Sequence, residues 1–206
     1  MIIVLDYGVG NLFSIRSALS FLNIPSEITS DPEKVKIADK IILPGVGAFE
    51  SAKKKLIKSG MEEALRERVK NGVPLLGICL GMQLLFEKSY EYGEHKGLGF
   101  LPGEVVPILN DAKKVTNENI KVPQMGWNSL EFYNPSPLLK YINDGDHVYY
   151  VHSYYAKNVG NCLVASSKYF IDITGISQLD NIFGTQFHPE KSGKTGLKIL
   201  TAFAEI

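Results

Sequence analysis

The sequence has no excess of charge of either sign. Its 22 Lys and Arg residues balance 22 Asp and Glu residues, so the formal net charge is zero. Proteins that bind nucleic acid over a broad surface usually carry a basic patch or stripe, and the balanced charge argues against one. The most evident basic cluster, Lys53 to Lys55, lies in a helical pattern and is interpreted as a solvated helix face.

Cysteine and long apolar runs are also scarce. Only Cys79 and Cys162 occur, whereas a secreted disulfide framework carries several cysteines in a much shorter chain. Met1 to Asp6 lacks the basic residues that begin a signal peptide. The longest apolar stretch, Val73 to Phe86, is interrupted and is shorter than the roughly 20 residues that span a bilayer. We therefore expect a protein of the reducing cytoplasm.

Short apolar runs alternate with helical patterns in the first half of the chain. Ile2 to Leu5, Ile41 to Leu43 and Leu75 to Ile78 are continuously apolar, as strands buried on both faces are. Apolar residues recur at helical spacing between and after these runs. The expected helices begin after Asn11, cover Ala48 to Lys70 with a break near Ser59-Gly60, and cover Leu80 to Lys88 and Gly193 to Glu205. This order predicts a parallel sheet with helices on both faces.

The second half of the chain is richer in β-type residues. Glu104 to Val106, His147 to Val151 and Ile182 to Thr185 are separated by clusters of Pro, Asn, Asp and Gly, which predicts antiparallel strands added to the parallel core. Asn110 to Lys121 is polar and is expected to be a solvated loop. Without repeats or linkers, residues 1–206 are expected to form one α/β domain with a mixed, mainly parallel sheet.

One segment, Gly77-Ile78-Cys79-Leu80-Gly81, stands where a predicted strand passes into a predicted helix. It has the form of the nucleophile elbow G-x-S-x-G with Cys in place of Ser. Glycine is needed because other side chains would collide with the crossing strand and helix. A helix N-terminus favours the thiolate, and the Leu80 N–H can point at a developing oxyanion. The segment also fits a buried structural cysteine between small residues.

A thiol nucleophile needs a base. The chain has four histidines, at His95, His147, His152 and His188. His188 ends an apolar strand and is followed by Pro189 and Glu190, whose carboxylate can orient the imidazole and stabilise its charged form. Carboxyl ends of strands in doubly wound sheets meet at one edge, where ligands bind. Cys79 and His188 are therefore expected to meet there.

Two of these segments resemble a known family. Gly77 to Gln83 (GICLGMQ) and Phe187 to Glu190 (FHPE) resemble the signature of the class I, triad-type glutamine amidotransferases. Further segments resemble, more narrowly, the glutaminase subunits of imidazole glycerol phosphate synthase from histidine biosynthesis. These segments are Asp6 to Asn11 (DYGVGN), Leu43 to Phe49 (LPGVGAF), Val122 to Asn128 (VPQMGWN), Val151 to Tyr155 (VHSYY) and Gln186 to Ser192 (QFHPEKS). The resemblance extends from near the first residue to the last helix.

The resemblance implies roles for individual residues. Cys79 attacks the side-chain amide of glutamine, His188 transfers the protons and Glu190 holds His188. The residues implied to bind glutamine and its oxyanion are Gly47, Leu80, Gln83 and the backbone of Ser153 and Tyr154. The glycine loop around Gly47 also fits an ordinary turn. No cofactor or metal is implied.

The resemblance also implies a partner, a cyclase subunit with a (β/α)8 barrel that docks over the mouth of the active site and receives the ammonia. Trp127, the only tryptophan, is a candidate contact because tryptophan is enriched at interface centres, although it fits a core position equally well. Asn11, Tyr149 and Lys191 are further candidates for this face. Tyr149 and its neighbouring tyrosines also fit strand packing.

Other functions are less compatible with the sequence. Gly8-Val9-Gly10 follows a strand, but the third glycine of a dinucleotide-binding motif would fall at Phe13. No close-spaced pair of metal ligands occurs. Two alternatives stay open, a triad glutaminase that serves anthranilate or pyridoxal phosphate synthesis, and a non-catalytic regulatory subunit. The complete Cys-His-Glu set argues against the second.

Overall fold

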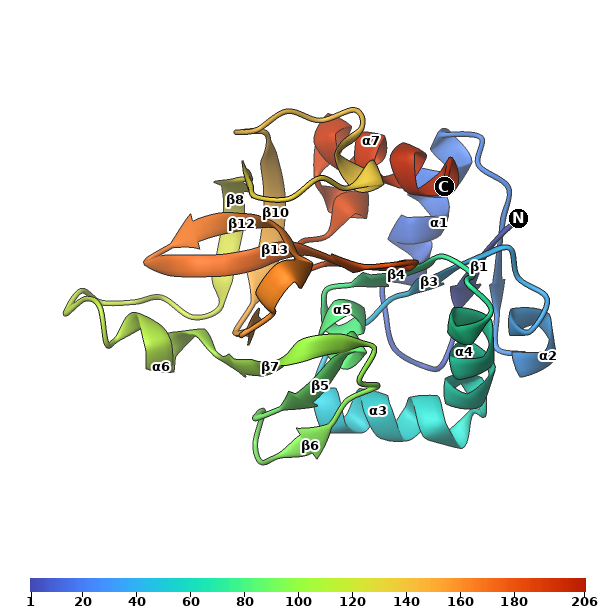
Figure 1. Cartoon of the computed structure of the whole chain (residues 1–206), viewed down its shortest axis with the longest axis horizontal. Coiled ribbons are helices and arrows are strands. Elements are labelled where there is room, and N and C mark those ends of the chain that lie inside the picture. Colours follow the sequence, from blue (N-terminus) through green and yellow to red (C-terminus); the bar gives the residue numbers. More distant parts are fainter.

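An eight-stranded sheet runs through the middle of the computed structural model, which describes residues 1–206 (Figure 1). In spatial order its strands are β2 (Ser26–Thr29), β1 (Ile2–Leu5), β3 (Lys40–Leu43), β4 (Leu75–Ile78), β14 (Ile182–Thr185), β13 (Ile171–Leu179), β12 (Leu163–Tyr169) and β9 (Glu131–Phe132). Strands β2 to β14 of this order are parallel, and β14 to β9 are antiparallel. The predicted mixed sheet is confirmed.

Helices cover both faces of the parallel part of the sheet (Figure 1). They are α1 (Leu12–Phe21) and α7 (Gly193–Ala204) on one face, and α2 (Pro32–Val35), α3 (Phe49–Lys58), α4 (Met61–Lys70) and α5 (Leu80–Leu85) on the other. Side chains of β1 alternate between these layers, with Ile2 and Val4 in one buried cluster and Ile3 and Leu5 in the other. This arrangement explains why the strands are apolar throughout.

Two smaller sheets lie beside the main one. The first pairs β8 (Gln124–Ser129) with β10 (His147–His152), and the second has the order β11 (Tyr154–Lys157), β7 (Leu101–Pro107), β5 (Phe86–Ser89), β6 (His95–Lys96). The remaining short helices are α6 (Ile108–Ala112), η1 (Pro137–Leu139), η2 (Gly160–Cys162) and η3 (Pro189–Lys191). None of the helices has the length and apolar character that crossing a membrane requires.

The helix predicted over Leu80 to Lys88 is shorter than expected, because α5 ends at Leu85 and β5 begins at Phe86. Backbone N–H groups of the segment 98–100 donate to the carbonyl groups of residues 84–86, at distances of 2.8 to 3.1 Å. These bonds satisfy the last carbonyls of the helix from outside it. The end of the helix is therefore decided by residues 98–100, which lie more than ten positions further along the chain.

Two further expectations need correction, and one strand was not predicted. The loop expected from Asn110 to Lys121 begins inside α6, whose Ile108 and Ala112 are buried on one side. Strand β2 was not expected, although it forms an edge of the main sheet. The solvated face predicted for Lys53 to Lys55 is wrong for Lys53, which is mostly buried and pairs with Glu62.

Candidate active site

Cys79 and His188 follow neighbouring strands of the main sheet. Strands β4 and β14 pair in parallel, with Ile78 opposite Thr185 at their carboxyl ends. Cys79 comes directly after Ile78, and its N–H donates a 2.7 Å hydrogen bond to the carbonyl of Thr185. His188 lies just beyond the end of β14. The sheet edge at which doubly wound folds bind ligands therefore holds both side chains.

Cys79 occupies a strained turn between β4 and α5. Its φ of 54° is left-handed, a conformation that non-glycine residues rarely adopt. A Cβ at Gly81 would lie 1.9 Å from the Leu43 carbonyl oxygen on β3. A Cβ at Gly77 would lie 2.7 Å from the backbone nitrogen of Met82 on α5. The close approach of strand and helix therefore requires both glycines, as the motif predicts.

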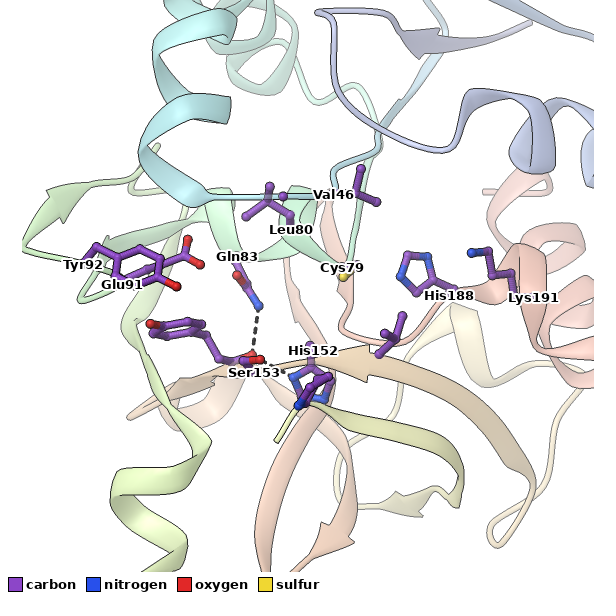
Figure 2. A pocket seen from close by; sticks show the side chains of 14 residues that line it. Val46, Cys79, Leu80, Gln83, Glu91, Tyr92, His152, Ser153, His188 and Lys191 are labelled. Carbon is purple, nitrogen blue, oxygen red and sulfur yellow. Dashed lines mark hydrogen bonds between the residues drawn. The ribbon is translucent and has the colours of Figure 1, made fainter. Parts of the chain in front are cut away.

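His188 is oriented by Glu190. The imidazole Nδ1–H donates to Glu190 Oε1 over 2.8 Å, and the two side chains are only 3% and 1% exposed. A carboxylate only accepts hydrogen bonds, so Nδ1 carries the proton and Nε2 is left to act on Cys79. Figure 2 shows the His188 ring beside Cys79. The three side chains thus lie in the order Cys79, His188 and Glu190, which is the order of nucleophile, base and acid.

Backbone contacts from β10 fix the position of this base. The His188 N–H donates to the Tyr149 carbonyl at 3.0 Å. The Ser192 hydroxyl donates to the His188 carbonyl at 2.6 Å and accepts from the Tyr149 N–H at 2.9 Å. A closed set of hydrogen bonds therefore holds the turn that carries His188 against β10.

Two opposing effects act on the pKa of His188. Burial disfavours the imidazolium and lowers the pKa, whereas the neighbouring Cys79 thiol and Glu190 carboxylate favour the imidazolium. The neighbouring groups have the larger effect and raise the pKa to about 10. His188 therefore holds a proton at neutral pH and places a positive charge beside the Cys79 sulfur.

A cavity of about 470 Å³ opens over the nucleophile (Figure 2). The residues predicted from the sequence that line it are Gly47, Cys79, Leu80, Gln83, Ser153, Tyr154, His188 and Lys191. Glu190 does not reach the cavity but stands behind His188. The fold therefore brings the predicted substrate-binding residues and the nucleophile to one place.

Both amide hydrogens of Gln83 are used inside the protein. Its Nε2 donates to the Tyr154 carbonyl at 2.9 Å and to Gln186 Oε1 at 3.0 Å. Gln186 in turn donates to the sulfur of Cys79 at 3.7 Å. Only the side-chain oxygen of Gln83 is free to meet a ligand. Gln186 belongs to the site although the sequence suggested no role for it beyond its place directly after β14.

The backbone of Ser153 and Tyr154 is available to a ligand only in part. The Ser153 carbonyl accepts from the Ile108 N–H at 3.0 Å. The Tyr154 carbonyl accepts from Gln83 and, at 2.7 Å, from His152 Nδ1. The Ser153 N–H makes no hydrogen bond within the chain. Of the predicted backbone contacts to glutamine, the Ser153 N–H is therefore the clearest.

Glu91 and Tyr92, in the connection from β5 to β6, carry no local sequence signal that marks them as part of a site. Glu91 is the only carboxylate that lines the cavity, and it accepts a 2.5 Å hydrogen bond from the Phe49 N–H at the start of α3. Tyr92 lies at the cavity edge, its ring centroid 6.4 Å from that of Tyr154. Only the tertiary structure identifies these two residues.

His152 lies beside the cavity but is a poor base. Burial lowers its pKa, the hydrogen bond to the Tyr154 carbonyl opposes this effect, and nearby His188 lowers it further, to about 4. Its Nδ1 carries the proton that bonds Tyr154, and its Nε2 is buried without a partner. His188, which holds a proton at neutral pH, is therefore the histidine of this cavity suited to proton transfer.

The same burial makes His152 a source of acid sensitivity. Its pKa falls from 6.5 to about 4 on folding, so at intermediate pH only the unfolded chain binds the proton, and stability decreases as the pH falls. Since one pKa unit is worth about 1.4 kcal/mol, the free energy of unfolding should fall by about 2 kcal/mol more between pH 7 and pH 5 in the wild type than in His152→Asn. Urea unfolding at both pH values measures this difference. Equal losses in the two proteins would contradict it.

The predicted partner contacts differ in their surroundings. Trp127 and Tyr149 lie opposite each other on β8 and β10, with ring centroids 5.9 Å apart. Trp127 is 54% exposed, so the core alternative is wrong. Lys191 is exposed at the cavity, whereas the Asn11 side chain caps α1 by accepting from the Ser14 N–H at 3.3 Å.

The second cysteine is not a second nucleophile, and the acidic residues do not form a metal site. Cys162 is buried in η2, where burial and then Asp180 raise its pKa, so it remains a thiol. No group of three or more His, Cys, Asp and Glu side chains is arranged to hold a metal ion. The candidate chemistry is confined to the cavity at Cys79.

Comparison with known proteins places this geometry in context. A family model described as class-I glutamine amidotransferase matches residues 3–205. The chain is 48% identical to the imidazole glycerol phosphate synthase subunit HisH of Geobacillus kaustophilus, over 100% of this chain and 97% of that one. It is 45% identical to the same subunit of Listeria monocytogenes, over 100% and 96%.

Solved structures show the same fold at low sequence identity. A structure described as a glutamine amidotransferase has a TM-score of 0.74 and 19% identity, over 98% of this chain and 97% of that one. A chain of PurLQS from Thermotoga maritima has a TM-score of 0.73 and 17% identity, over 99% and 97%. These two likenesses support the fold alone.

Proposed function

Because the chain belongs to the class I glutamine amidotransferases, and within them to the HisH subunits of imidazole glycerol phosphate synthase, we propose that Cys79, His188 and Glu190 are the triad with which it hydrolyses glutamine. The chain is thus a glutaminase subunit of histidine biosynthesis. One observation carries the assignment of the triad. Parallel pairing of β4 with β14 brings a strained cysteine and a carboxylate-bound histidine to the same cavity. Residues 1–206 act as one glutamine amidotransferase domain.

The first half of the reaction makes ammonia. The Cys79 thiolate attacks the side-chain amide carbon of glutamine, and the negative charge moves to the amide oxygen. The Leu80 N–H and N–H groups of the loop at Gly47 stabilise this oxyanion. His188 donates its proton to the amide nitrogen, the carbon–nitrogen bond breaks, and ammonia leaves a glutamyl thioester on Cys79.

The second half regenerates the thiol. His188, now neutral, removes a proton from a water molecule as this water attacks the thioester carbon. The carbon–sulfur bond breaks, glutamate forms and the sulfur recovers its proton from His188. Glu190 accepts the Nδ1–H bond throughout, so it stabilises the imidazolium in both halves.

Three groups of the cavity match the amino-acid end of glutamine. Glu91 supplies the only carboxylate, which pairs with the α-ammonium group. The free side-chain oxygen of Gln83 accepts a second hydrogen bond from the same group. The unpaired Ser153 N–H donates to the α-carboxylate. The substrate is thereby held with its amide toward Cys79.

A partner receives the ammonia. The mouth of the cavity carries exposed Val46, Lys191 and Tyr92, and the exposed Trp127 packs edge-to-face against Tyr149 nearby. Aromatic side chains at a surface are typical of interface centres. The relatives are named as subunits of imidazole glycerol phosphate synthase. We infer that a (β/α)8-barrel cyclase covers this face and keeps ammonia out of water.

The partner is expected to activate the glutaminase. Gly47 is exposed with a φ of 94°, and a Cβ there would meet no atom within 4 Å, so packing does not fix the tip of the loop that carries the oxyanion donors. Loss of one such donor costs about 10²-fold in rate. The isolated chain should therefore release ammonia from glutamine about 10²-fold more slowly than the chain with its cyclase and nucleotide ligand. Glutamate formation measured with and without the cyclase tests this.

Each outcome of this experiment has a separate meaning. Full activity of the isolated chain would contradict the proposed activation by the partner but not the assignment of the triad. Restoration by the partner of an anthranilate or pyridoxal phosphate synthase, and not by the cyclase, would contradict the proposed partner. Trp127→Ala should raise the cyclase concentration needed for half-activation, whereas Phe21→Ala, which removes an even more exposed aromatic side chain from α1, should not.

A further inference from the structure

Tyr7, which follows β1, makes a long-range hydrogen bond to the loop after β3. Its hydroxyl is buried and donates to the carbonyl of Pro44 over 2.6 Å, and the residue is only 5% exposed. A buried tyrosine hydroxyl normally finds some acceptor. Here the acceptor is the first residue after β3, at the base of the loop that leads to Gly47. The bond therefore ties the end of β1 to the proposed oxyanion loop.

The base of this loop is tightly packed, whereas its tip is not. A Cβ at Gly10 would lie 2.9 Å from Pro44 Cβ, and a Cβ at Gly45 would lie 2.6 Å from the backbone nitrogen of Gly81. At Gly47 there is no such contact within 4 Å. Tight packing confines Pro44 and Gly45, so free movement is limited to the residues that follow them.

The far end of the loop is also anchored. The N–H of Phe49, the first residue of α3, donates to Glu91. Lys55 of α3 donates from Nζ to the Gly8 carbonyl at 2.9 Å, which joins this helix to the segment that carries Tyr7. Residues 46–48 therefore lie between two anchored ends.

Tyr7 is also close to the nucleophile. Its pKa is raised far above the usual value, first by burial and then by the proximity of Cys79. The hydroxyl therefore keeps its proton at any working pH and always acts as a donor. Val46, in the loop that follows Pro44, lines the same cavity as Cys79 and Leu80 (Figure 2).

We propose that Tyr7 is a positioning residue, which holds the Pro44–Gly45 peptide so that the loop N–H groups meet the oxyanion formed on glutamine. The C=O and N–H of a trans peptide point in opposite directions, so fixing the Pro44 carbonyl fixes the Gly45 N–H. Misplacement by about 1 Å can cost 10²-fold in rate. The inference rests on the proposed glutaminase function and adds a residue to it.

Tyr7→Phe in the complex with the cyclase tests this role. We expect kcat for glutamine hydrolysis to fall about tenfold, because the loop loses its anchor but keeps its donors. KM for glutamine should stay within about twofold, since Tyr7 is not among the groups that hold the amino-acid end. Synthesis from free ammonium should be unchanged.

A second measurement separates the loop from the thiol. Alkylation of Cys79 by iodoacetamide displaces iodide without forming an oxyanion, so its rate in Tyr7→Phe should equal that of the wild type. Tyr155→Phe is the matched control. Tyr155 is also 5% exposed, but its hydroxyl donates at 3.0 Å to Asp111 of α6 and not to the loop after β3. This control should keep the wild-type kcat.

Several results would overturn the proposal. These are a wild-type or raised kcat in Tyr7→Phe, an equal loss in Tyr155→Phe, or a parallel loss of Cys79 alkylation. If Tyr7→Phe does not fold, Gly10→Ala is the second variant. Its added Cβ would lie 2.9 Å from Pro44 Cβ and so displace Pro44. This variant must then show the same selective loss of kcat. A wild-type complex that does not hydrolyse glutamine would instead contradict the proposed function itself.

Discussion

Cys79→Ala is expected to abolish glutamine-dependent synthesis by the complex, with activity reduced by several orders of magnitude. Thiolate attack requires sulfur at this position, and the only other cysteine, Cys162, is buried in η2. Alanine fits the site because Cys79 sits on a turn whose shape is set by its glycine neighbours. Glutamate release, followed at saturating glutamine, measures the loss.

The control for this variant is synthesis from free ammonium. Ammonia supplied in solution bypasses the glutaminase, so Cys79→Ala should keep the wild-type rate with ammonium. Cys162→Ala should be nearly silent with either nitrogen source. Substantial glutamine turnover by Cys79→Ala would rule out the mechanism, and loss of the ammonium-dependent rate would point to a damaged complex.

His188→Asn is expected to reduce glutamine hydrolysis by several orders of magnitude as well. The variant removes the group that accepts the thiol proton and returns it to the leaving nitrogen. Glu190→Gln should cost less, because the Tyr149 and Ser192 contacts still hold the His188 backbone in place and a glutamine side-chain oxygen can still accept the Nδ1–H bond. Comparison of kcat for the two variants in the complex measures the order of effects.

A pH measurement strengthens this test. Glu190 is one of the two groups that raise the pKa of His188, so in Glu190→Gln that pKa should fall and the basic limb of the activity profile should move to lower pH. His147→Asn, at the exposed start of β10, is the matched histidine control and should keep wild-type activity. Equal activity of His188→Asn and wild type would refute the assignment of the base.

Local features of the sequence were enough to predict most of the architecture. Ile2 to Leu5 and Leu75 to Ile78 are apolar throughout because helices cover both faces of their sheet, and this pattern is visible without coordinates. The glycines at 77 and 81 were predicted for a steric reason, and their contacts with α5 and β3 bear it out. The break between α3 and α4 also falls where Gly60 adopts a positive φ of 74°.

Features that depend on distant neighbours were not predictable in this way. The end of α5 at Leu85 is decided by N–H groups of residues 98–100, and Lys53 is buried by its pairing with Glu62 of the next helix. Neither effect leaves a periodic pattern in the sequence. Trp127 illustrates the same limit. Its sequence context fits an interface contact and a core position equally well, and only its 54% exposure in the structure decides against the core.

The sequence by itself determined the buried strands of the core, the elbow at Cys79 and the pairing of His188 with Glu190, because each of these features is encoded in a short contiguous segment. Only the tertiary structure decided which groups of Gln83 and Ser153 remain free for a ligand, that Glu91 and Gln186 belong to the site, and that Tyr7 bonds the base of the loop beside it. Their partners are far apart in the chain, as with Tyr7 and Pro44 or Gln83 and Tyr154. Hydrogen bonds between such residues depend on how the strands are paired, and strand pairing is a property of the whole fold.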